Sequence, residues 1–462
     1  MANKFDAIVI GTGQAGPSLT NRLAESGMKV AVIERKLFGG TCVNTGCIPT
    51  KTLVASARAI HMARRGDEYG FSTGHIEVDM KRVKARKDEV SGASNSSVEH
   101  WLKNLDNVTA IEGHARFTGT KTIEVNGEEL EADKIFINVG GRAFIPDMPG
   151  LDEVQYLTNS SMMDVDFVPE HLIIIGGSYI GLEFAQMYRR FGSEVTVVEK
   201  SSRLIAREDE DVSAVVLEVL EREGINVRLN AECITTGKKG NKVVVGVDCE
   251  NGEPKIEGSH LFLAVGRTPN THDLGLEHTG VKVNERGYIQ VDDQLRTNVE
   301  GIWALGDVNG RGAFTHTAYN DFEIVAGNLL DDDPRRVTDR IMCYALYVDP
   351  PLGRIGMTEK QARESGRNVL IGKRPMTKVG RAKEKGDTDG FIKVLVDADS
   401  EEILGAAILG LNGDEVVHSI LDVMYAGGTY KTISRAVHIH PTVTELVPTT
   451  LQDLKPLGAQ QG

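Results

Sequence analysis

The sequence predicts an α/β protein in which one strand–loop–helix–strand unit occurs twice. A mainly apolar run at residues 5–10 and an aliphatic run at residues 172–175 are each followed at once by a glycine-rich hexapeptide and then by a helical pattern. A second apolar strand follows in both units, at residues 30–33 and 194–198, and leads into a glutamate. Glycine accounts for 50 of the 462 residues, whereas aromatic residues make up 5%. This composition suits a protein with many tight turns and close backbone approaches.

The first hexapeptide, residues 11–16, has the form G-x-G-x-x-G. In such a loop Gly11 allows the tight turn, Gly13 lets a pyrophosphate approach the backbone, and Gly16 lets helix and strand pack closely. The following helix offers N–H groups and the positive end of its dipole to phosphates. Glu34, which ends the second strand, can accept hydrogen bonds from a ribose diol. Together these elements predict a Rossmann-like, dinucleotide-binding domain.

The second hexapeptide, residues 176–181, ends in Gly181 but carries Ser178 where the middle glycine belongs. Serine is small enough to preserve the loop, although it fits a pyrophosphate less well. In both units 23 positions separate the first glycine from the terminal glutamate, which is Glu199 in the second unit. The repeat predicts a second dinucleotide site. The alternative is a duplicated unit that no longer binds a cofactor.

Three further strands are predicted to end in glycine turns. Residues 135–139 precede Gly140-Gly141, residues 261–265 precede Gly266-Arg267, and residues 302–305 precede Gly306-Asp307. An aspartate at the carboxyl end of a strand lies where open α/β sheets bind ligands. Asp307 is therefore a candidate ligand-binding residue, and a turn or helix cap is the alternative.

Cys42 and Cys47 lie in a glycine-rich segment that also contains Lys51. On a regular helix two residues five positions apart point about 140° away from each other, so a disulfide would need a bend such as Gly46 allows. A zinc site needs about four ligands, and the other three cysteines are isolated. We favour a redox dithiol over zinc, with no metal expected, and over an inert pair; Lys51 could place a cation beside it.

His440 is a candidate proton carrier. It precedes Pro441, and Glu445 follows five positions later. Imidazole titrates near neutral pH, and a carboxylate on one ring nitrogen fixes its tautomer and raises its basicity. Thiol–disulfide exchange needs such a group because the thiolate is the nucleophile. A structural His-Pro pair is the alternative.

The charge excludes some partners. With 52 basic and 66 acidic residues the chain carries a formal charge of −14, which disfavours nucleic acid and anionic membranes as partners. No apolar run approaches the ~18 residues that a membrane span requires, and the N-terminus does not resemble a signal peptide. Sparse, odd-numbered cysteines argue against a disulfide framework. We expect a cytoplasmic protein.

These motifs resemble one family. The segment Gly-Gly-Thr-Cys-Val-Asn-Thr-Gly-Cys-Ile-Pro-Thr-Lys, residues 39–51, and His-Pro-Thr-x-x-Glu, residues 440–445, lie in that order around two nucleotide folds. The chain, from residue 5 to about 454, is similar to the class I flavin-dependent pyridine nucleotide–disulfide oxidoreductases. That group includes dihydrolipoyl dehydrogenase, glutathione reductase and mercuric reductase.

The resemblance implies two bound cofactors. It implies that the first fold binds FAD through Gly11, Gly13, Gly16, Glu34, Thr41, Lys51 and Ala115, with Asp307 and Thr315 also meeting the flavin. It implies that the second fold binds the nicotinamide cofactor through Ser178, Gly181, Glu199 and Gly266, with Tyr179 lying over the flavin until the nicotinamide displaces it. Because a carboxylate such as Glu199 repels a 2′-phosphate, we expect NADH to be preferred over NADPH.

The resemblance also implies catalytic roles. Cys47 matches the sulfur against the flavin and Cys42 the sulfur that attacks the substrate. Lys51 would pair with Glu183 near flavin N5, and His440 with Glu445 would be the base and its orienting acid. The implied assembly is a homodimer in which His440 of one chain completes the other chain's site. An apolar helical stripe at residues 416–424 is core in our interpretation, with an interface as the alternative.

The full fold prediction is therefore two Rossmann-like dinucleotide-binding domains and a C-terminal α+β dimerisation domain. The predicted FAD domain comprises residues 1–145 and 271–335, the NAD(P) domain 146–270 and the dimerisation domain 336–462.

The predicted function is an FAD-dependent NAD(P)H oxidoreductase that cycles a Cys42–Cys47 disulfide, similar to dihydrolipoyl dehydrogenase, with a small-molecule disulfide or other electron acceptor. Residues 314–322 and 350–356, with Thr50, depart from that enzyme. They look more like a mercuric-reductase-like branch, which includes the reactive-chlorine-resistance flavoprotein. Reduction of an oxidant, metal ion or quinone is therefore one alternative. A flavoprotein redox sensor is another. The absence of cysteine after Cys343 argues against efficient mercury handling.

Overall fold

The N-terminal strands form a seven-stranded sheet with the order β3-β2-β1-β6-β5-β4 and with β17 paired to β6. The computed structural model describes residues 2–248 and 254–458. The strands β3, β2, β1, β6 and β17 are parallel, whereas β5 and β4 are antiparallel additions. The strands are β1 (Asn3–Ile10), β2 (Val30–Glu34), β3 (Val108–Glu112), β4 (Arg116–Phe117), β5 (Thr122–Val125), β6 (Glu128–Ile137) and β17 (Ile302–Ala304).

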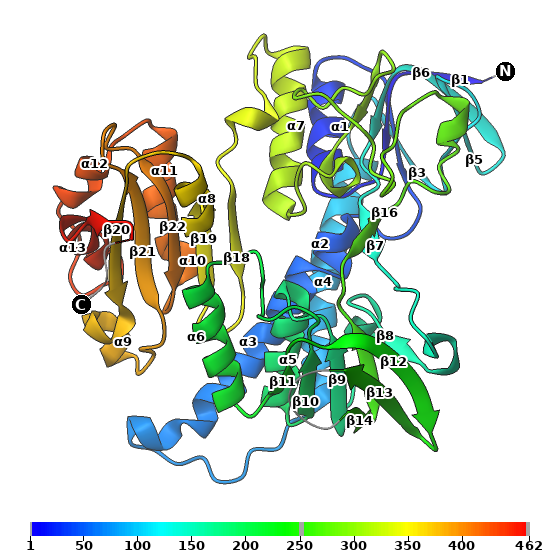
Figure 1. Ribbon diagram of the computed structural model, residues 1–462. Coiled ribbons are helices and arrows are strands. Elements are labelled where there is room, and N and C mark those ends of the chain that lie inside the picture. Colours follow the sequence, from blue (N-terminus) through cyan, green and yellow to red (C-terminus); the bar gives the residue numbers. More distant parts are fainter. Residues whose placement is uncertain (1, 249–253, 459–462) are drawn as a thin grey trace.

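Two helices pack together on this sheet. Helix α1 (Ala15–Glu25) follows the first glycine loop directly, and α7 (Thr315–Leu330) lies beside it (Figure 1). Leu19 and Leu23 of α1 and Phe322 of α7 belong to one buried apolar cluster. The amphipathic spacing of α1 therefore buries the face that the sequence predicts.

The second unit builds a five-stranded parallel sheet with the order β11-β10-β9-β15-β8. Helices α5 (Tyr179–Phe191) and α6 (Glu210–Arg222) belong to it, and β16 (Arg267–Pro269) pairs with β7 (Gly141–Ala143) where the two units meet. An antiparallel three-stranded sheet flanks it. The parallel sheet consists of β8 (Tyr156–Leu157), β9 (His171–Ile175), β10 (Glu194–Val198), β11 (Asn226–Arg228) and β15 (His260–Leu263). The flanking antiparallel sheet consists of β12 (Glu232–Lys239), β13 (Lys242–Asp248) and β14 (Lys255–Gly258).

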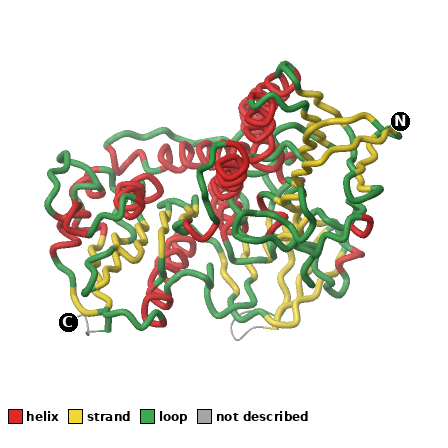
Figure 2. Tube along the Cα trace, turned by 90° about the horizontal axis from the view of Figure 1, so that it is seen from above, coloured by secondary structure: helices red, strands yellow, loops and turns green. Residues whose placement is uncertain are grey.

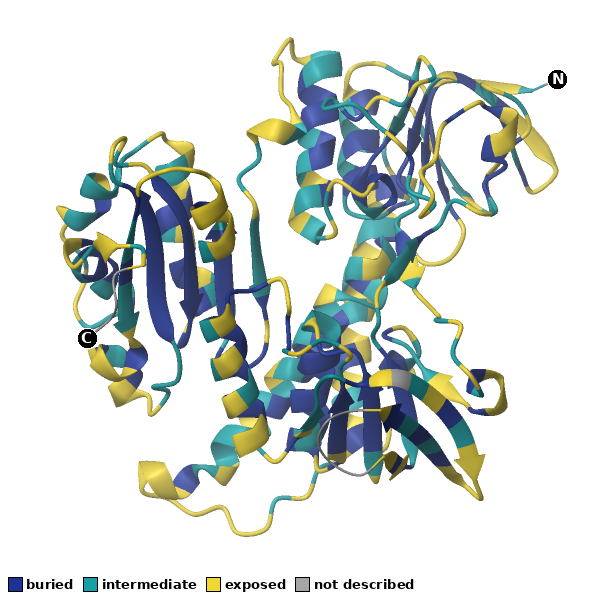
Figure 3. Cartoon of the chain, in the orientation of Figure 1, coloured by how far each residue is buried: buried dark blue, intermediate teal, exposed yellow. Residues whose placement is uncertain are grey.

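The C-terminal part forms a six-stranded antiparallel sheet with the order β18-β19-β22-β21-β20-β23. Every residue of β21 and β22 is buried, as the uniformly dark strands in Figure 3 show. The strands are β18 (Cys343–Leu346), β19 (Leu352–Gly356), β20 (Val369–Pro375), β21 (Phe391–Asp397), β22 (Ile403–Leu409) and β23 (Lys455–Pro456). The helices are α8 (Glu359–Glu364), α9 (Gly380–Glu384), α10 (Gly413–Val416), α11 (His418–Tyr425), α12 (Tyr430–Ser434) and α13 (Leu446–Gln452).

The predicted architecture of two Rossmann-like units and an α+β C-terminal part is confirmed. The apolar stripe at residues 416–424 packs mainly into the core of the C-terminal part, with Ile420 and Leu421 buried. Seen from above, the strands nearest the N-terminus and those nearest the C-terminus lie at opposite ends of the molecule, with helices between them (Figure 2). No helix among the described residues is both long and apolar enough to cross a membrane.

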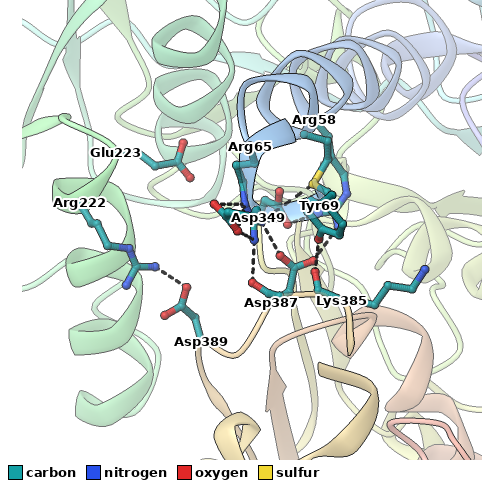
Figure 4. A network of polar contacts seen from close by, with 12 residues as sticks. Arg58, Arg65, Tyr69, Arg222, Glu223, Asp349, Lys385, Asp387 and Asp389 are labelled. Atoms are coloured by element: carbon teal, nitrogen blue, oxygen red, sulfur yellow. Dashed lines mark hydrogen bonds and ion pairs between the residues drawn. The ribbon is translucent and has the colours of Figure 1, made fainter. Parts of the chain in front are cut away.

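A long helix links the parts of the molecule. Short α2 (Gly40–Asn44) is followed by α3 (Cys47–Arg64), which runs diagonally past the second unit in Figure 1 and packs against α4 (Met80–Lys103) and α5. Figure 4 shows Arg58 and Arg65 at the far end of α3, reaching toward Asp349 and Asp387 of the C-terminal part. Arg58 pairs with both aspartates, and Arg65 Nη1 lies 2.7 Å from Asp387 Oδ1.

The carboxylate of Asp349 joins three parts of the chain. Besides Arg58 of α3 it binds Arg190 of α5, whose Nη1 lies 2.8 Å from Oδ2. Arg190 is almost fully buried and also pairs with Glu223 at 2.7 Å. Burial alone would raise the pKa of Asp349, but Arg190 and Arg58 lower it below its usual value. The charged form is therefore stabilised by folding, and this contribution is lost as the pH falls below about 4.

We expect Asp349→Asn to destabilise the protein by about 3 kcal/mol, because Arg190 would keep a buried charge with one partner fewer. Thermal unfolding at neutral pH measures the loss. Asp389→Asn is the matched control, since the pair that it breaks with Arg222 is far more exposed and is worth about 0–1 kcal/mol. Equal losses in the two variants would contradict the assignment.

Candidate active site

Both glycine loops bring a helix start against a strand end. A Cβ on Gly16 would lie 2.3 Å from the carbonyl oxygen of Gly11, and a Cβ on Gly181 would lie 2.0 Å from that of Gly176. Neither position accepts a larger residue without moving the helix. A Cβ on Gly13 would lie 3.5 Å from the amide nitrogen of Asn138, and this amide donates to the carbonyls of Gly11 and Gly13.

The two terminal glutamates occupy equivalent places. Glu34 Oε2 accepts from the N–H and the hydroxyl of Thr12, at 3.0 and 2.7 Å. Glu199 accepts from the N–H groups of Gly177 and Ser201, at 2.7 and 2.8 Å. Each carboxylate is thus fixed against its glycine loop and keeps lone pairs for a ribose. Gly266, in the left-handed region at φ 131°, follows β15 of the same sheet.

The two cysteines lie on different helices. Cys42 lies in α2, and Cys47 is the first residue of α3, because the chain bends at Thr45 and Gly46 between them. Both are free thiols. Cys47 Sγ lies 3.0 Å from Thr315 Oγ1 at the start of α7. Thr41 precedes Cys42 in α2. The bend that the sequence suggested for a redox pair lies between the two cysteines.

The environment makes the two thiols unequal. The pKa of Cys47 is lowered to about 6, chiefly because the Cys42 side chain donates a hydrogen bond to it; burial opposes this, while Thr315 and Lys51 support it. The pKa of Cys42 is raised, mostly by that same hydrogen bond and then by burial. At neutral pH Cys47 is therefore the thiolate and Cys42 the thiol.

Lys51, one turn after Cys47, forms an ion pair with Glu183 of α5, with Nζ 2.6 Å from Oε2. The other Glu183 oxygen accepts from the N–H of Tyr347 at 3.1 Å, and Lys51 Nζ lies 4.3 Å above the Tyr347 ring. The predicted Lys51–Glu183 pair is thus present. Tyr347 was missed, because nothing in the local sequence marks it.

The residues present fit FAD. Ala115 is buried just after β3, and Asp307 follows β17 in a single turn of 3-10 helix, Gly306–Asn309. Burial raises the pKa of Asp307, although Arg267 lies 3.4 Å away. A partly buried carboxylate of this kind is a good acceptor for ligand hydroxyl groups. It lies at the carboxyl edge of the sheet that carries the first glycine loop.

Tyr179 begins α5 immediately after Ser178, and its hydroxyl donates to Glu208 at 3.2 Å. A cavity of about 1750 Å³ opens beside it, between the two nucleotide folds and the C-terminal part. Basic residues are prominent in its walls, among them Arg203, Arg207, Arg267, Arg311 and Arg340.

His440 and Glu445 form the predicted pair, with Nδ1 3.0 Å from both carboxylate oxygens. The His440 side chain is 78% exposed, whereas that of Glu445 is 15% exposed. Helix α13, which directly follows Glu445, lies at the left edge of the molecule in Figure 1, whereas α2 lies near its middle. Within residues 2–248 and 254–458, no contact joins His440 to either cysteine of the same chain.

One group of acids has the spacing of a metal site. Asp209, Asp211 and Glu359 point their oxygens at one another. The ammonium of Lys393, however, lies 2.8 Å from each of the three carboxylates. A cation of the chain itself already occupies the centre of the cluster, so we assign no metal there.

Comparison with known proteins identifies the family. The family model described as pyridine nucleotide-disulphide oxidoreductase matches residues 5–321, and the model of its dimerisation domain matches residues 342–451.

The curated relatives span most of the chain. The probable pyridine nucleotide-disulfide oxidoreductase RclA of Escherichia coli is 36% identical over 96% of this chain and 98% of that protein. Dihydrolipoyl dehydrogenase of Thermus scotoductus is 34% identical over 96% and 95%. Mercuric reductase of Bacillus cereus is 32% identical over 96% of this chain and 70% of that protein.

A solved structure agrees in fold. The HOCl-induced flavoprotein disulfide reductase RclA from Escherichia coli superposes with a TM-score of 0.89 at 35% identity, covering 97% of this chain and 100% of that one. Matching models over both parts of the chain and relatives above 30% identity along its length lead to one conclusion: the chain belongs to the pyridine nucleotide–disulfide oxidoreductases, an enzyme family that uses FAD and a pyridine nucleotide.

Proposed function

We propose that this enzyme uses FAD and NADH to reduce a Cys42–Cys47 disulfide and passes the electrons to a small disulfide or another small-molecule acceptor. One observation carries the proposal: the bend between α2 and α3 sets two thiols of opposite pKa shift side by side. A low-pKa thiolate beside a neutral thiol is the arrangement that a dithiol needs for two successive exchange steps.

The first glycine loop and Glu34 would hold FAD, which would supply the redox chemistry that links the nicotinamide to the protein disulfide. The chain's own residues then complete the exchange. A base first takes the proton of the Cys42 thiol, whose pKa is raised. The Cys42 thiolate then attacks a sulfur of the acceptor disulfide, and the protonated base gives the proton to the departing thiolate. Cys47 thiolate next attacks the Cys42 sulfur, which releases the second thiolate and re-forms the protein disulfide. Lys51 stabilises the negative charge on Cys47 throughout.

The proton would come from His440. Its exposure and its distance from the cysteines in one chain support a homodimer in which each chain supplies the imidazole of the other site. Val437 and Ile439 beside it are fully and 80% exposed, and such apolar exposure favours a partner surface. Glu445 fixes the imidazole through Nδ1 and leaves Nε2 for proton transfer.

Reduction of an oxidant or metal ion is the second candidate. The Escherichia coli relative is described as HOCl-induced, and it has been solved as a Cu(II) complex. The free thiols of Cys42 and Cys47 are soft ligands of the type that binds copper. A redox sensor remains the alternative outside catalysis, and sustained NADH turnover with an added acceptor distinguishes it. Five cysteines in 462 residues, too few and odd in number for a disulfide framework, support a cytoplasmic location.

The pH dependence of the thiolate tests the dithiol. In the FAD-loaded, two-electron-reduced protein we expect flavin–thiolate charge-transfer absorbance from Cys47 that is present above about pH 6 and lost below it. Cys47→Ser should abolish the band. Cys42→Ala should shift its midpoint to higher pH because it removes the hydrogen bond that lowers the Cys47 pKa, whereas Cys42→Ser keeps a donor. A band independent of both residues would contradict the assignment.

The choice of reductant tests the second nucleotide site. We expect kcat/KM for NADH to exceed that for NADPH by at least about tenfold, or 1.4 kcal/mol. The carboxylate of Glu199 would repel a 2′-phosphate, and Arg203 is already engaged by Glu210 at 3.1 Å. Steady-state kinetics with both nucleotides measure the ratio. A tenfold preference for NADPH would reject this assignment.

His440→Gln distinguishes the two classes of acceptor. Loss of a general acid–base typically slows a reaction by 10²–10⁴-fold, so disulfide reduction should slow by about that factor while reduction of the flavin by NADH stays nearly unchanged. Glu445→Gln should do less harm, because it removes the orienting charge and not the proton carrier. Rapid mixing of each half-reaction provides the measurement. An unchanged oxidative half-reaction with the physiological acceptor would favour metal-ion or oxidant reduction over disulfide exchange.

A further inference from the structure

The hydroxyl of Tyr179 is bound by a carboxylate that is itself immobilised. Glu208 has no exposed side-chain surface, and its Oε1 accepts from Tyr179 at 3.2 Å and from the hydroxyl of Tyr344. The Tyr179 ring stands edge-on to the rings of Tyr344 and Phe314, with centroids 5.5 and 6.5 Å apart. The tyrosine is therefore fixed in a defined rotamer by both its ring and its hydroxyl.

The second oxygen of Glu208 binds a residue from another sheet. Arg354, in the middle of β19, donates to Oε2 from Nε and Nη2 at 3.0 and 2.6 Å, and also reaches Asp209 at 2.8 Å. The Arg354 side chain is fully buried. Moving Glu208 would leave its own buried charge without Arg354 and would leave Arg354 with Asp209 as its remaining carboxylate partner, which is unfavourable in the interior. The Glu208 carboxylate is thus held in place, and Tyr179 is the side chain beside it that moves.

A segment with backbone strain, residues 205–208, connects Glu208 to the second glycine loop. Ile205 is buried at φ 42°, a conformation that β-branched residues rarely adopt. Its N–H donates to the carbonyl of Gly177 at 2.8 Å, and the N–H of Glu208 donates to the carbonyl of Ile205 at 2.8 Å. Strain of this kind persists only where the surroundings enforce it, and it often marks functional segments.

We propose that Glu208 is a latch that keeps Tyr179 closed over the flavin site until a nicotinamide ring displaces it. The proposal rests on the proposed function and on the role that the family resemblance implies for Tyr179, which lies over the flavin until the nicotinamide displaces it. Opening breaks the Tyr179–Glu208 hydrogen bond. Tyr344 remains on the same oxygen, so the buried carboxylate keeps a donor when Tyr179 leaves. Glu208 is a positioning residue, since it acts through Tyr179.

The latch lowers apparent affinity by reducing the fraction of protein that is open to the nicotinamide. Tyr179→Phe keeps the ring and removes the bond that must break, so more of the protein is open. Tyr344→Phe removes the donor that remains after opening, so less of the protein is open. The two variants each delete one hydroxyl from the same oxygen, yet their effects should have opposite signs. A general loosening of the site would instead change the apparent affinity of both variants in the same direction.

Calorimetric titration of the FAD-loaded, oxidised protein with NAD⁺ tests the latch. Tyr179→Phe should lower the Kd about tenfold, the factor expected for one hydrogen bond to a charged group, and Tyr344→Phe should raise it. ADP-ribose is the matched ligand control: it lacks the nicotinamide, so its Kd should be equal in both variants and in the unaltered protein. Thermal midpoints confirm that the variants fold.

Equal signs for the two variants, or equal shifts with ADP-ribose, would overturn the latch. Failure of the unaltered protein to bind either NAD⁺ or NADP⁺ would overturn the latch and the proposed function together. Binding without reduction of the flavin by NADH or NADPH would overturn the proposed function alone, because the titrations still decide the latch. If NADP⁺ is the ligand that binds, the same comparison is made with its 2′-phosphorylated ADP-ribose.

Discussion

The orientation of the two nucleotide folds depends on helix α3 being anchored at both ends. Near its start Lys51 is paired with Glu183 of α5, and at its far end Arg58 shares the Asp349 carboxylate with Arg190. Cys47 begins this helix. A shift of α3 would therefore separate Lys51 from Glu183 of α5 and the Cys47 thiol from Thr315 of α7 at the same time. Because electron transfer between two cofactors and a dithiol requires fixed spacing, these anchors matter more for alignment than for net stability.

Buried charge is used repeatedly where the parts of the chain meet. Arg354 and Lys393 have almost no exposed surface, and each meets two or three carboxylates from other elements. Buried pairs contribute little net stability, since desolvation offsets their attraction. Their geometry is, however, restrictive, because a misplaced sheet would leave an unpaired ion in the interior. We interpret them as devices that select one docking geometry between the second nucleotide fold and the C-terminal sheet.

Sequence spacing predicted the local parts of the site and missed the long-range ones. The first glycine loop meets Glu34 through Thr12 within one supersecondary unit, and His440 meets Glu445 five positions later. Their spacing therefore constrains their geometry. Lys51 and Glu183 could be paired only through family resemblance. Glu208 and Arg354 are 146 positions apart and have no local signature. Tertiary packing alone brings them together, which is why the anchor of Tyr179 could not be read from the sequence.

One chain supplies only one side of the surroundings that we propose for the dithiol. Toward the second nucleotide fold lie Glu183, Tyr179 and the buried carboxylate behind it, all supplied by the same chain. The proposed acid–base pair is instead exposed at a distant edge, beside apolar residues that nothing in the described chain covers. If the partner subunit supplies that imidazole, a monomer could accept electrons but exchange disulfides poorly. Association would then control the oxidative half of the cycle and leave the reductive half to each chain alone.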